Sequence, residues 1–192
     1  MTPQMLSDAR SGLAGVVRLL FGQPGYHAHF DVSAGGVARS FSAALIALPL
    51  AFVTTGLANA IIAADAQGRP MGATQVLTRW ALMWAYFPLL AAGVARLVGR
   101  PERFAPWVVV HNWTHLLIVA IQIVPFAFLS LGFVQPGSLL FIASIVFIAY
   151  AYVRVADAAL EVGAALAIGA GAANLLCTLA IDVLVGQVFA PG

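Results

Sequence analysis

Long apolar segments alternate along the chain with short stretches that hold nearly all of its charged residues. Between Arg103 and Arg154 lie fifty consecutive residues without a formal charge. A charged side chain at the centre of a bilayer costs about 2.5–3.5 kcal/mol or more, so such a gap is typical of membrane segments. The pattern predicts five membrane-spanning helices, at residues 40–64, 74–98, 104–131, 136–153 and 162–188.

The first region, residues 1–38, follows a different pattern and precedes the membrane domain at 39–192. Met5–Phe21 is predicted to form an amphipathic helix, and a polar connector follows it. At 100° per residue one apolar stripe holds Leu6, Ala9, Leu13, Val16, Val17 and Leu20, with Asp8, Ser11, Gly15 and Arg18 opposite. Such a helix either lies in the headgroup layer or packs against the protein. We favour the headgroup layer, because lipid lies beside the following span.

Two of the five spans have internal features that bear on their geometry. The span at 74–98 has an uncharged run of only sixteen residues, Trp80–Ala95. Arg79 and Arg96 must therefore extend to its two ends if it is to cross the bilayer. Pro49 should kink the span at 40–64. Gly132, Pro136 and Gly137 predict a tight turn between the third and fourth spans.

Composition agrees with a membrane protein and excludes several classes. Hydrophobic residues make up 62% of the chain and charged residues 8%, against roughly 25% charged in soluble domains. The net charge of +2 sits beside the apolar segments and not on one basic face, which disfavours nucleic-acid binding. The chain has no Lys for a retinal Schiff base. Its single cysteine, Cys177, permits neither an internal disulfide nor a multi-Cys metal site.

Arginine distribution predicts the orientation. Seven of the nine Arg residues fall on one predicted side, namely Arg10, Arg18, Arg39, Arg96, Arg100, Arg103 and Arg154. Only Arg69 and Arg79 fall on the other side. The positive-inside rule then places the N-terminus in the cytoplasm and, after five spans, the C-terminus outside. We expect a multi-pass protein of the inner membrane.

Polar side chains recur on particular faces of three predicted spans. His111, His115 and Gln122 lie within about 40° of one another on one helix face, with Asn112 beside them. The last span carries Asn174, Thr178 and Asp182 at intervals of four, and the first carries Thr55 and Asn59. Because polar groups facing lipid are costly, we expect the first, third and fifth spans to pack around one polar interior. Small residues spaced by four should allow close helix contact: Ala165 and Gly169, Ala167 and Gly171, Gly169 and Ala173.

Three interpretations of these polar residues remain open. They can be structural, forming interhelical hydrogen bonds of roughly 0.6 kcal/mol each. They can form a path for protons or a substrate, with His115, Gln122, Asn174 and Asp182 as its members. A metal or haem site is the third, and its candidate ligands are His27, His29, His111 and His115. We favour structural histidines and predict no cofactor and no catalytic residue, because no zincin spacing, nucleophile elbow or phosphate loop is present.

The layout also resembles a known family. The run from Asp31 through Gly36 to Arg39, the first span with Pro49, and the triplet His111-Asn112-Trp113 are similar to bacterial chains of the Yip-like family of five-span membrane proteins. The resemblance implies an inner-membrane protein without a defined activity. We therefore expect a non-enzymatic role in membrane organisation or partner binding, with the bilayer, membrane proteins or a second copy as partners. The alternatives are a small transporter, channel or proton conductor, and a His-ligated metal or haem protein.

Overall fold

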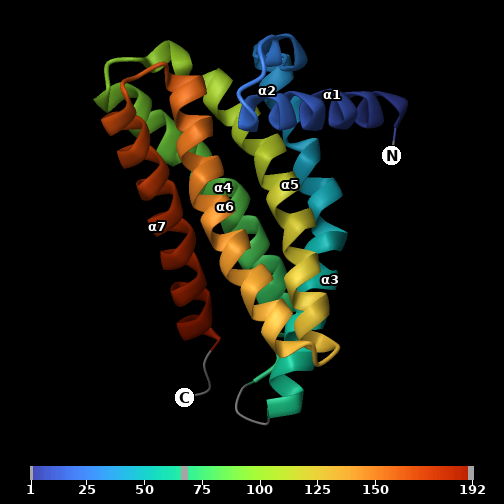
Figure 1. The fold of residues 1–192 in the computed structure, drawn as a ribbon. Coiled ribbons are helices and arrows are strands. Elements are labelled where there is room, and N and C mark those ends of the chain that lie inside the picture. Colours follow the sequence, from blue (N-terminus) through green and yellow to red (C-terminus); the bar gives the residue numbers. More distant parts are fainter. Residues whose placement is uncertain (1, 66–68, 190–192) are drawn as a thin grey trace.

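The computed structural model describes residues 2–65 and 69–189, and within these ranges the secondary structure is entirely helical. The five long helices lie side by side, and the N-terminal helix lies across an end of the bundle (Figure 1). The elements in chain order are α1 (Pro3–Leu20), η1 (Tyr26–His29), α2 (Ala34–Ser40), α3 (Ser42–Asp65), α4 (Ala73–Leu97), η2 (Pro101–Arg103), α5 (Phe104–Ser130), α6 (Val134–Leu160) and α7 (Ala164–Val188).

All five predicted spans are present as helices long and apolar enough to cross a membrane. The chain is thus an all-α, multi-pass membrane bundle preceded by an N-terminal amphipathic helix. The second predicted span, whose uncharged run is only sixteen residues, is confirmed as the 25-residue helix α4, about 38 Å long at 1.5 Å per residue. α3 continues through Pro49 without interruption.

Helix α5 is the centre of the bundle. It packs against α3, α4 and α6 along its length and against α1 and α2 near its start. Its first half is buried almost all round, including Trp107, Val108 and Val109. α7 stands at the edge of the bundle, where it packs against α6 and α4. A helix that touches most of the others needs apolar residues on every face, which explains why α5 shows no clear amphipathic stripe.

The packing corrects the predicted arrangement of the spans. The prediction that the first, third and fifth spans surround one interior is wrong for the first span, because α3 packs on α5 and α4 while α7 packs on α6 and α4. The polar faces of the third and fifth spans do meet, at His111 and Asn174. Polar spacing identified faces that avoid lipid, but it could not identify their neighbours. The polar face of α7 meets α4 through Tyr86 and α5 through His111.

The fourth span is longer than predicted, and the turn before it is shorter. Gly132, with φ of +84°, makes the turn, while Pro136 and Gly137 already belong to α6. Proline is tolerated there because the first-turn N–H groups of a helix have no intrahelical partner. At its other end α6 continues through Arg154 and ends at Glu161, whose φ is +51°.

Helix α1 lies across the bundle end and is seated on it by small residues (Figure 1). A Cβ at Gly12 would lie 2.4 Å from the indole ring of Trp113, so only glycine allows this contact. The predicted apolar stripe of α1 is buried in part and exposed in part. Val16 is buried, together with Leu19, which the predicted stripe omitted, whereas Leu6 is 54% and Val17 is 41% exposed. Helix α1 therefore packs on the protein with one flank and leaves the other flank open.

Candidate functional site

A hydrogen-bonded network connects three helices in the interior. The hydroxyl of Tyr86 on α4 donates to Asn174 Oδ1 on α7 at 2.6 Å and lies 2.9 Å from Thr178 Oγ1. The amide nitrogen of Asn174 lies 3.4 Å from Nδ1 of His111 on α5. Asn174 and His111 are almost fully buried. The predicted polar faces of α5 and α7 are therefore brought together, with Tyr86 as a member that the sequence analysis missed.

Aromatic rings surround the two histidines of this face. The imidazole of His111 stacks on Phe87 with ring centroids 3.3 Å apart and planes 7° from parallel. The ring of His115 meets Trp84 edge to face at 5.2 Å, and the two imidazoles are 5.7 Å apart. Phe87 and Trp84 both come from α4. This side of the histidine face is therefore a packed aromatic layer.

Farther along the same face, polar atoms are buried without partners. Within the described residues, Nδ1 of His115, Oε1 of Gln122 and Nε1 of Trp80 are buried and make no hydrogen bond. A cavity of about 40 Å³ lies between α3, α4 and α5, and its lining includes His115, Trp80, Thr55 and Arg79. A volume of this size can hold a water molecule or a small ion.

An ion pair between α4 and α7 lies at the end of the polar region that is farther from α1. Arg79 Nε on α4 lies 2.6 Å from Asp182 Oδ1 on α7, and Nη2 lies 3.3 Å from Oδ2. This two-point contact gives Asp182, near the C-terminal end of α7, a fixed partner. The sequence pattern predicts Arg79 at the end of its span but gives no sign of its pairing with Asp182. Because the two residues lie on different helices, no fixed spacing in the sequence indicates that they pair.

Two other predicted polar residues lie outside this network. Asn112 on α5 donates to Ser40 Oγ at 2.9 Å and so ties α5 to the end of α2. Asn59 on α3 bonds both the carbonyl and the N–H of Met71, at 3.0 and 2.8 Å. Asn59 therefore holds the segment before α4 and does not face the interior that we predicted for it.

The four candidate metal ligands are not assembled. His27 is exposed and lies beside the ring of Tyr26 in η1, whereas His111 and His115 lie inside the bundle. Among residues 2–65 and 69–189, no group of three or more His, Cys, Asp or Glu side chains is placed to hold a metal ion. Haem or metal ligation by these histidines gains no geometric support.

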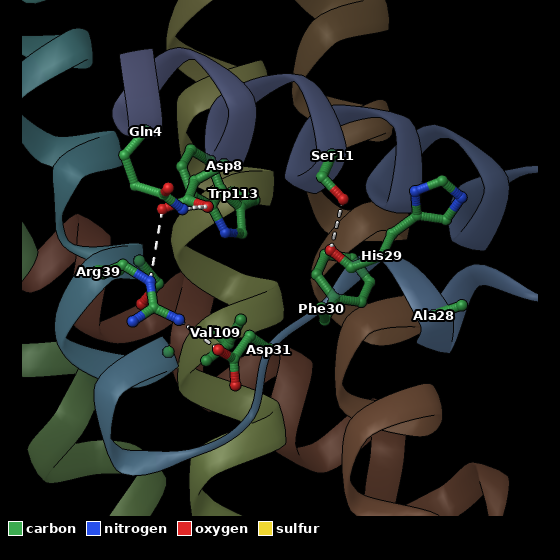
Figure 2. A pocket seen from close by; sticks show the side chains of 12 residues that line it. Gln4, Asp8, Ser11, Ala28, His29, Phe30, Asp31, Arg39, Val109 and Trp113 are labelled. Carbon is green, nitrogen blue, oxygen red and sulfur yellow. Dashed lines mark hydrogen bonds and ion pairs between the residues drawn. The ribbon is translucent and has the colours of Figure 1, made fainter. Parts of the chain in front are cut away.

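A hollow that the sequence did not predict lies under α1. This α1 pocket has a volume of about 340 Å³. Its walls are formed by four parts of the chain: α1, residues 28–31 at the end of η1 and after it, α2, and α5 (Figure 2). Its lining residues are Gln4, Asp8, Ser11, Ala28, His29, Phe30, Asp31, Gly36, Arg39, Ser40, Val109 and Trp113.

Three charged residues form a chain at one side of the α1 pocket. Figure 2 shows Arg39 between Asp8 and Asp31. Its Nε lies 3.5 Å from Asp8 Oδ2, and its Nη2 pairs with Asp31 Oδ2. Hydrogen bonds from Ser33, with the nearby Arg39, hold the pKa of Asp31 below its usual value. Asp31 is therefore ionised at neutral pH, and the three residues carry a net charge of −1.

The geometry of the α1 pocket depends on local sequence signals. Ser33 caps α2 by accepting from the N–H of Gly36 at 3.1 Å, and Asp31 Oδ1 accepts from the N–H of Ser33 at 2.9 Å. A Cβ at Gly36 would lie 1.9 Å from the Asp31 carbonyl oxygen, so glycine is required there. The Asp-x-Ser spacing predicts such a turn and helix start. Nothing in the sequence places Asp8 against Arg39.

Further contacts fix the C-terminal end of α1 to the bundle. The hydroxyl of Tyr150 donates to the carbonyl of Leu20 at 2.6 Å, and Arg154 Nη2 lies 3.4 Å from the carbonyl of Leu19. These carbonyls belong to the last turn of α1, where helices lack internal donors. Nearby, Arg103 pairs with Glu161 across the ends of α5 and α6. The α1 end of the bundle is thus held by polar contacts that the sequence did not reveal.

Comparison with protein-family models, curated proteins and solved structures gave no match.

Proposed function

We propose that the protein is a non-enzymatic, multi-pass protein of the inner membrane that organises the bilayer through α1. The observation that carries this proposal is the open apolar flank of α1. Leu6 and Val17 on this helix and Phe21, which directly follows it, are 54%, 41% and 78% exposed, and the helix crosses the bundle end. Exposed Arg10 and Arg18 accompany them. An apolar flank with basic residues beside it suits insertion into the headgroup layer.

The orientation belongs to the same proposal. The α1 end carries seven of the nine Arg residues, so it is assigned to the cytoplasm, with the C-terminus outside. Five closely spaced spans also support a distant relationship to the Yip-like family. On this proposal the buried His111–Asn174–Tyr86 network stabilises the bundle, as interhelical hydrogen bonds do in other membrane proteins.

Vesicle shape tests the role of α1. Wild-type protein reconstituted at rising density should change the diameter of liposomes imaged in vitreous ice. The triple substitution Leu6→Gln, Val17→Gln, Phe21→Gln should abolish that change, because it removes apolar area that would enter the lipid. The control is Leu131→Gln with Phe133→Gln, which alters two exposed apolar side chains at the opposite end.

Two outcomes would count against membrane organisation by α1. One is a wild-type protein that leaves vesicle diameter unchanged. The other is an equal loss of the effect in the control. Crosslinking from the α1 flank to a membrane protein, or to a second copy, would instead favour partner binding at the same surface.

Proton or small-ion conduction is the second candidate, and a specific observation favours it. His115 and Gln122 have buried polar atoms without partners, and His115 lines a cavity that also reaches Arg79. Arg79 is paired with Asp182, so ionisable groups extend from the cavity to the α1-distal end. Groups of this kind inside a membrane are common in ion and proton paths.

Flux measurements separate this candidate from a structural role. If the path conducts, His115→Ala or Asp182→Asn should abolish proton flux into liposomes carrying a pH-sensitive dye. His27→Ala, on an exposed residue of η1, is the control and should conduct like the wild type. A wild-type protein without flux above that of empty liposomes would exclude the path, and undiminished flux in both variants would remove these residues from it.

A further inference from the structure

The α1 pocket has the size and chemistry of a binding site for a small polar ligand. Its volume of about 340 Å³ falls within the roughly 300–1,000 Å³ common for ligand sites. The lining combines charged groups from α1 and α2 with the apolar Val109, Phe30 and Trp113. Arg39 and Asp31 form an ion pair in which neither side chain is deeply buried, because 45% of the Arg39 side chain and 52% of the Asp31 side chain are exposed. A ligand entering from the headgroup layer can therefore reach them.

The charged chain offers both acceptors and donors beyond those already used. Each carboxylate has about four acceptor positions. Asp8 uses one acceptor position for the Gln4 amide, at 2.9 Å, and one for Arg39. Asp31 uses one acceptor position for the N–H of Ser33 and one for Arg39. A guanidinium has five N–H donors, and Arg39 directs only Nε and Nη2 to these carboxylates. Trp113 adds an indole N–H.

This combination favours a ligand with a cationic and an anionic part. A primary ammonium can donate to the free positions of Asp8 and Asp31, while a phosphate can accept from Arg39. The net charge of −1 among these three residues disfavours a purely anionic group. A quaternary ammonium has no N–H to donate, so it would leave the carboxylates less well satisfied.

The position of the α1 pocket suits a lipid headgroup. α5 has 27 residues and is about 40 Å long, whereas the hydrocarbon core of a bilayer is about 30 Å thick. The first turns of α5 therefore extend into the headgroup layer. The floor residues Val109 and Trp113 lie about 8 and 14 Å along the axis from Phe104, near the boundary between headgroups and hydrocarbon.

We propose that the α1 pocket binds a phosphoethanolamine group, a primary ammonium joined through two carbons to a phosphate, presented by a phospholipid. The ammonium is held by Asp8 and Asp31, and the phosphate is held by Arg39. This inference rests on the proposed function, in which α1 lies in the headgroup layer. It adds a specific lipid chemistry to what the exposed flank of α1 would do through its apolar area alone.

Calorimetric titration of the detergent-solubilised full chain with short-chain phospholipids tests the proposal. Phosphatidylethanolamine should bind about tenfold more tightly than phosphatidylcholine and phosphatidylglycerol, since one charge-assisted hydrogen bond is worth about that factor. Asp8→Asn should reduce the affinity for phosphatidylethanolamine by about tenfold as well. The matched control is Asp157→Asn, at the same end of the bundle but outside the pocket, and it should bind like the wild type.

A second arm identifies the source of the ligand. Glycerophosphoethanolamine, which has no acyl chains, should compete only weakly if the site takes a lipid; competition as strong as that of the lipid would contradict the lipid assignment. Should Asp8→Asn fold poorly, Asp31→Asn provides the same loss of charge on another element. Equal binding of all three lipids by the wild type, or unchanged binding by both pocket variants, would overturn the proposal.

The vesicle-shape assay keeps this inference separate from the proposed function. If Asp8→Asn still reshapes vesicles and the lipids bind without preference, only the pocket assignment fails. If the flank variant fails to lose the shape effect while phosphatidylethanolamine binds selectively, only the role of the α1 flank fails.

Discussion

Replacing Gly171 by leucine is expected to lower the free energy of unfolding by about 3 kcal/mol, or more. A Cβ at this position on α7 would lie 2.8 Å from Val153 Cγ2 and 2.9 Å from the backbone nitrogen of Val153 on α6. The side chain of Val153 could turn away, but its backbone belongs to a continuous helix and cannot. α7 must therefore move outward, which would also disturb the contact of Asn174 with Tyr86.

The control is Gly169→Leu, two residues away on the same helix. A Cβ at Gly169 meets no atom within 4 Å, because this face of α7 is turned away from the bundle. Both substitutions gain the same helix propensity, so the difference between them reports packing alone. We expect Gly169→Leu to stay within about 0.5 kcal/mol of the wild type in denaturant titrations in detergent micelles. Equal destabilisation by the two variants would contradict the assigned α6–α7 contact.

Replacing Asp182 by leucine is expected to lower the free energy of unfolding by about 1–3 kcal/mol, because Arg79 would lose its partner. Solvent and lipid headgroups screen the unpaired charge and so reduce the loss of stability, because the side chains of Arg79 and Asp182 are 40% and 38% exposed. Thermal unfolding in lipid nanodiscs measures the loss. In the double variant Arg79→Leu, Asp182→Leu, most of the stability should return, because no unpaired charge remains.

The double-mutant cycle gives this prediction a clear test. If the ion pair links α4 to α7, the two single substitutions should each destabilise, and their combined effect should be smaller than their sum. Additive losses would show that Arg79 and Asp182 do not interact in the membrane. Asn59→Leu, which disturbs a different end contact, is the control for a general effect of removing a polar side chain.

Much of the architecture could be predicted from the sequence because the bilayer imposes a one-dimensional rule. A span needs about twenty apolar residues, and charges must stay near its ends. Phe104–Ser130 and Ala164–Val188 match the predicted spans within two residues at each end. The predicted fourth span is seven residues too short at its C-terminal end, because the charge of Arg154 indicates a loop. Arg154 instead lies within α6, where it forms an i, i+3 pair with Asp157 at 3.3 Å.

The site was less accessible to sequence reasoning. Periodicity placed His111 and His115 on one face, and the structure does bury that face. It could not show that Tyr86 completes the network, since a tyrosine in an apolar run carries no distinctive spacing. Small-residue spacing suggested Ala165 with Gly169 and Gly169 with Ala173 as well as Ala167 with Gly171. Gly169 points to open space, whereas Gly171 makes close contact and Ala167 is buried.

Membrane insertion, the five spans and the polar faces of the helices follow from the order of residues alone. These properties follow from the transfer of each side chain between water and hydrocarbon, which depends on local composition and helical spacing. The pairing of distant residues became known from the folded bundle: Arg79 with Asp182, Tyr86 with Asn174, and Arg39 with Asp8 across the α1 pocket. Such contacts depend on which helices lie side by side, and helices in lipid choose neighbours by shape and a few hydrogen bonds.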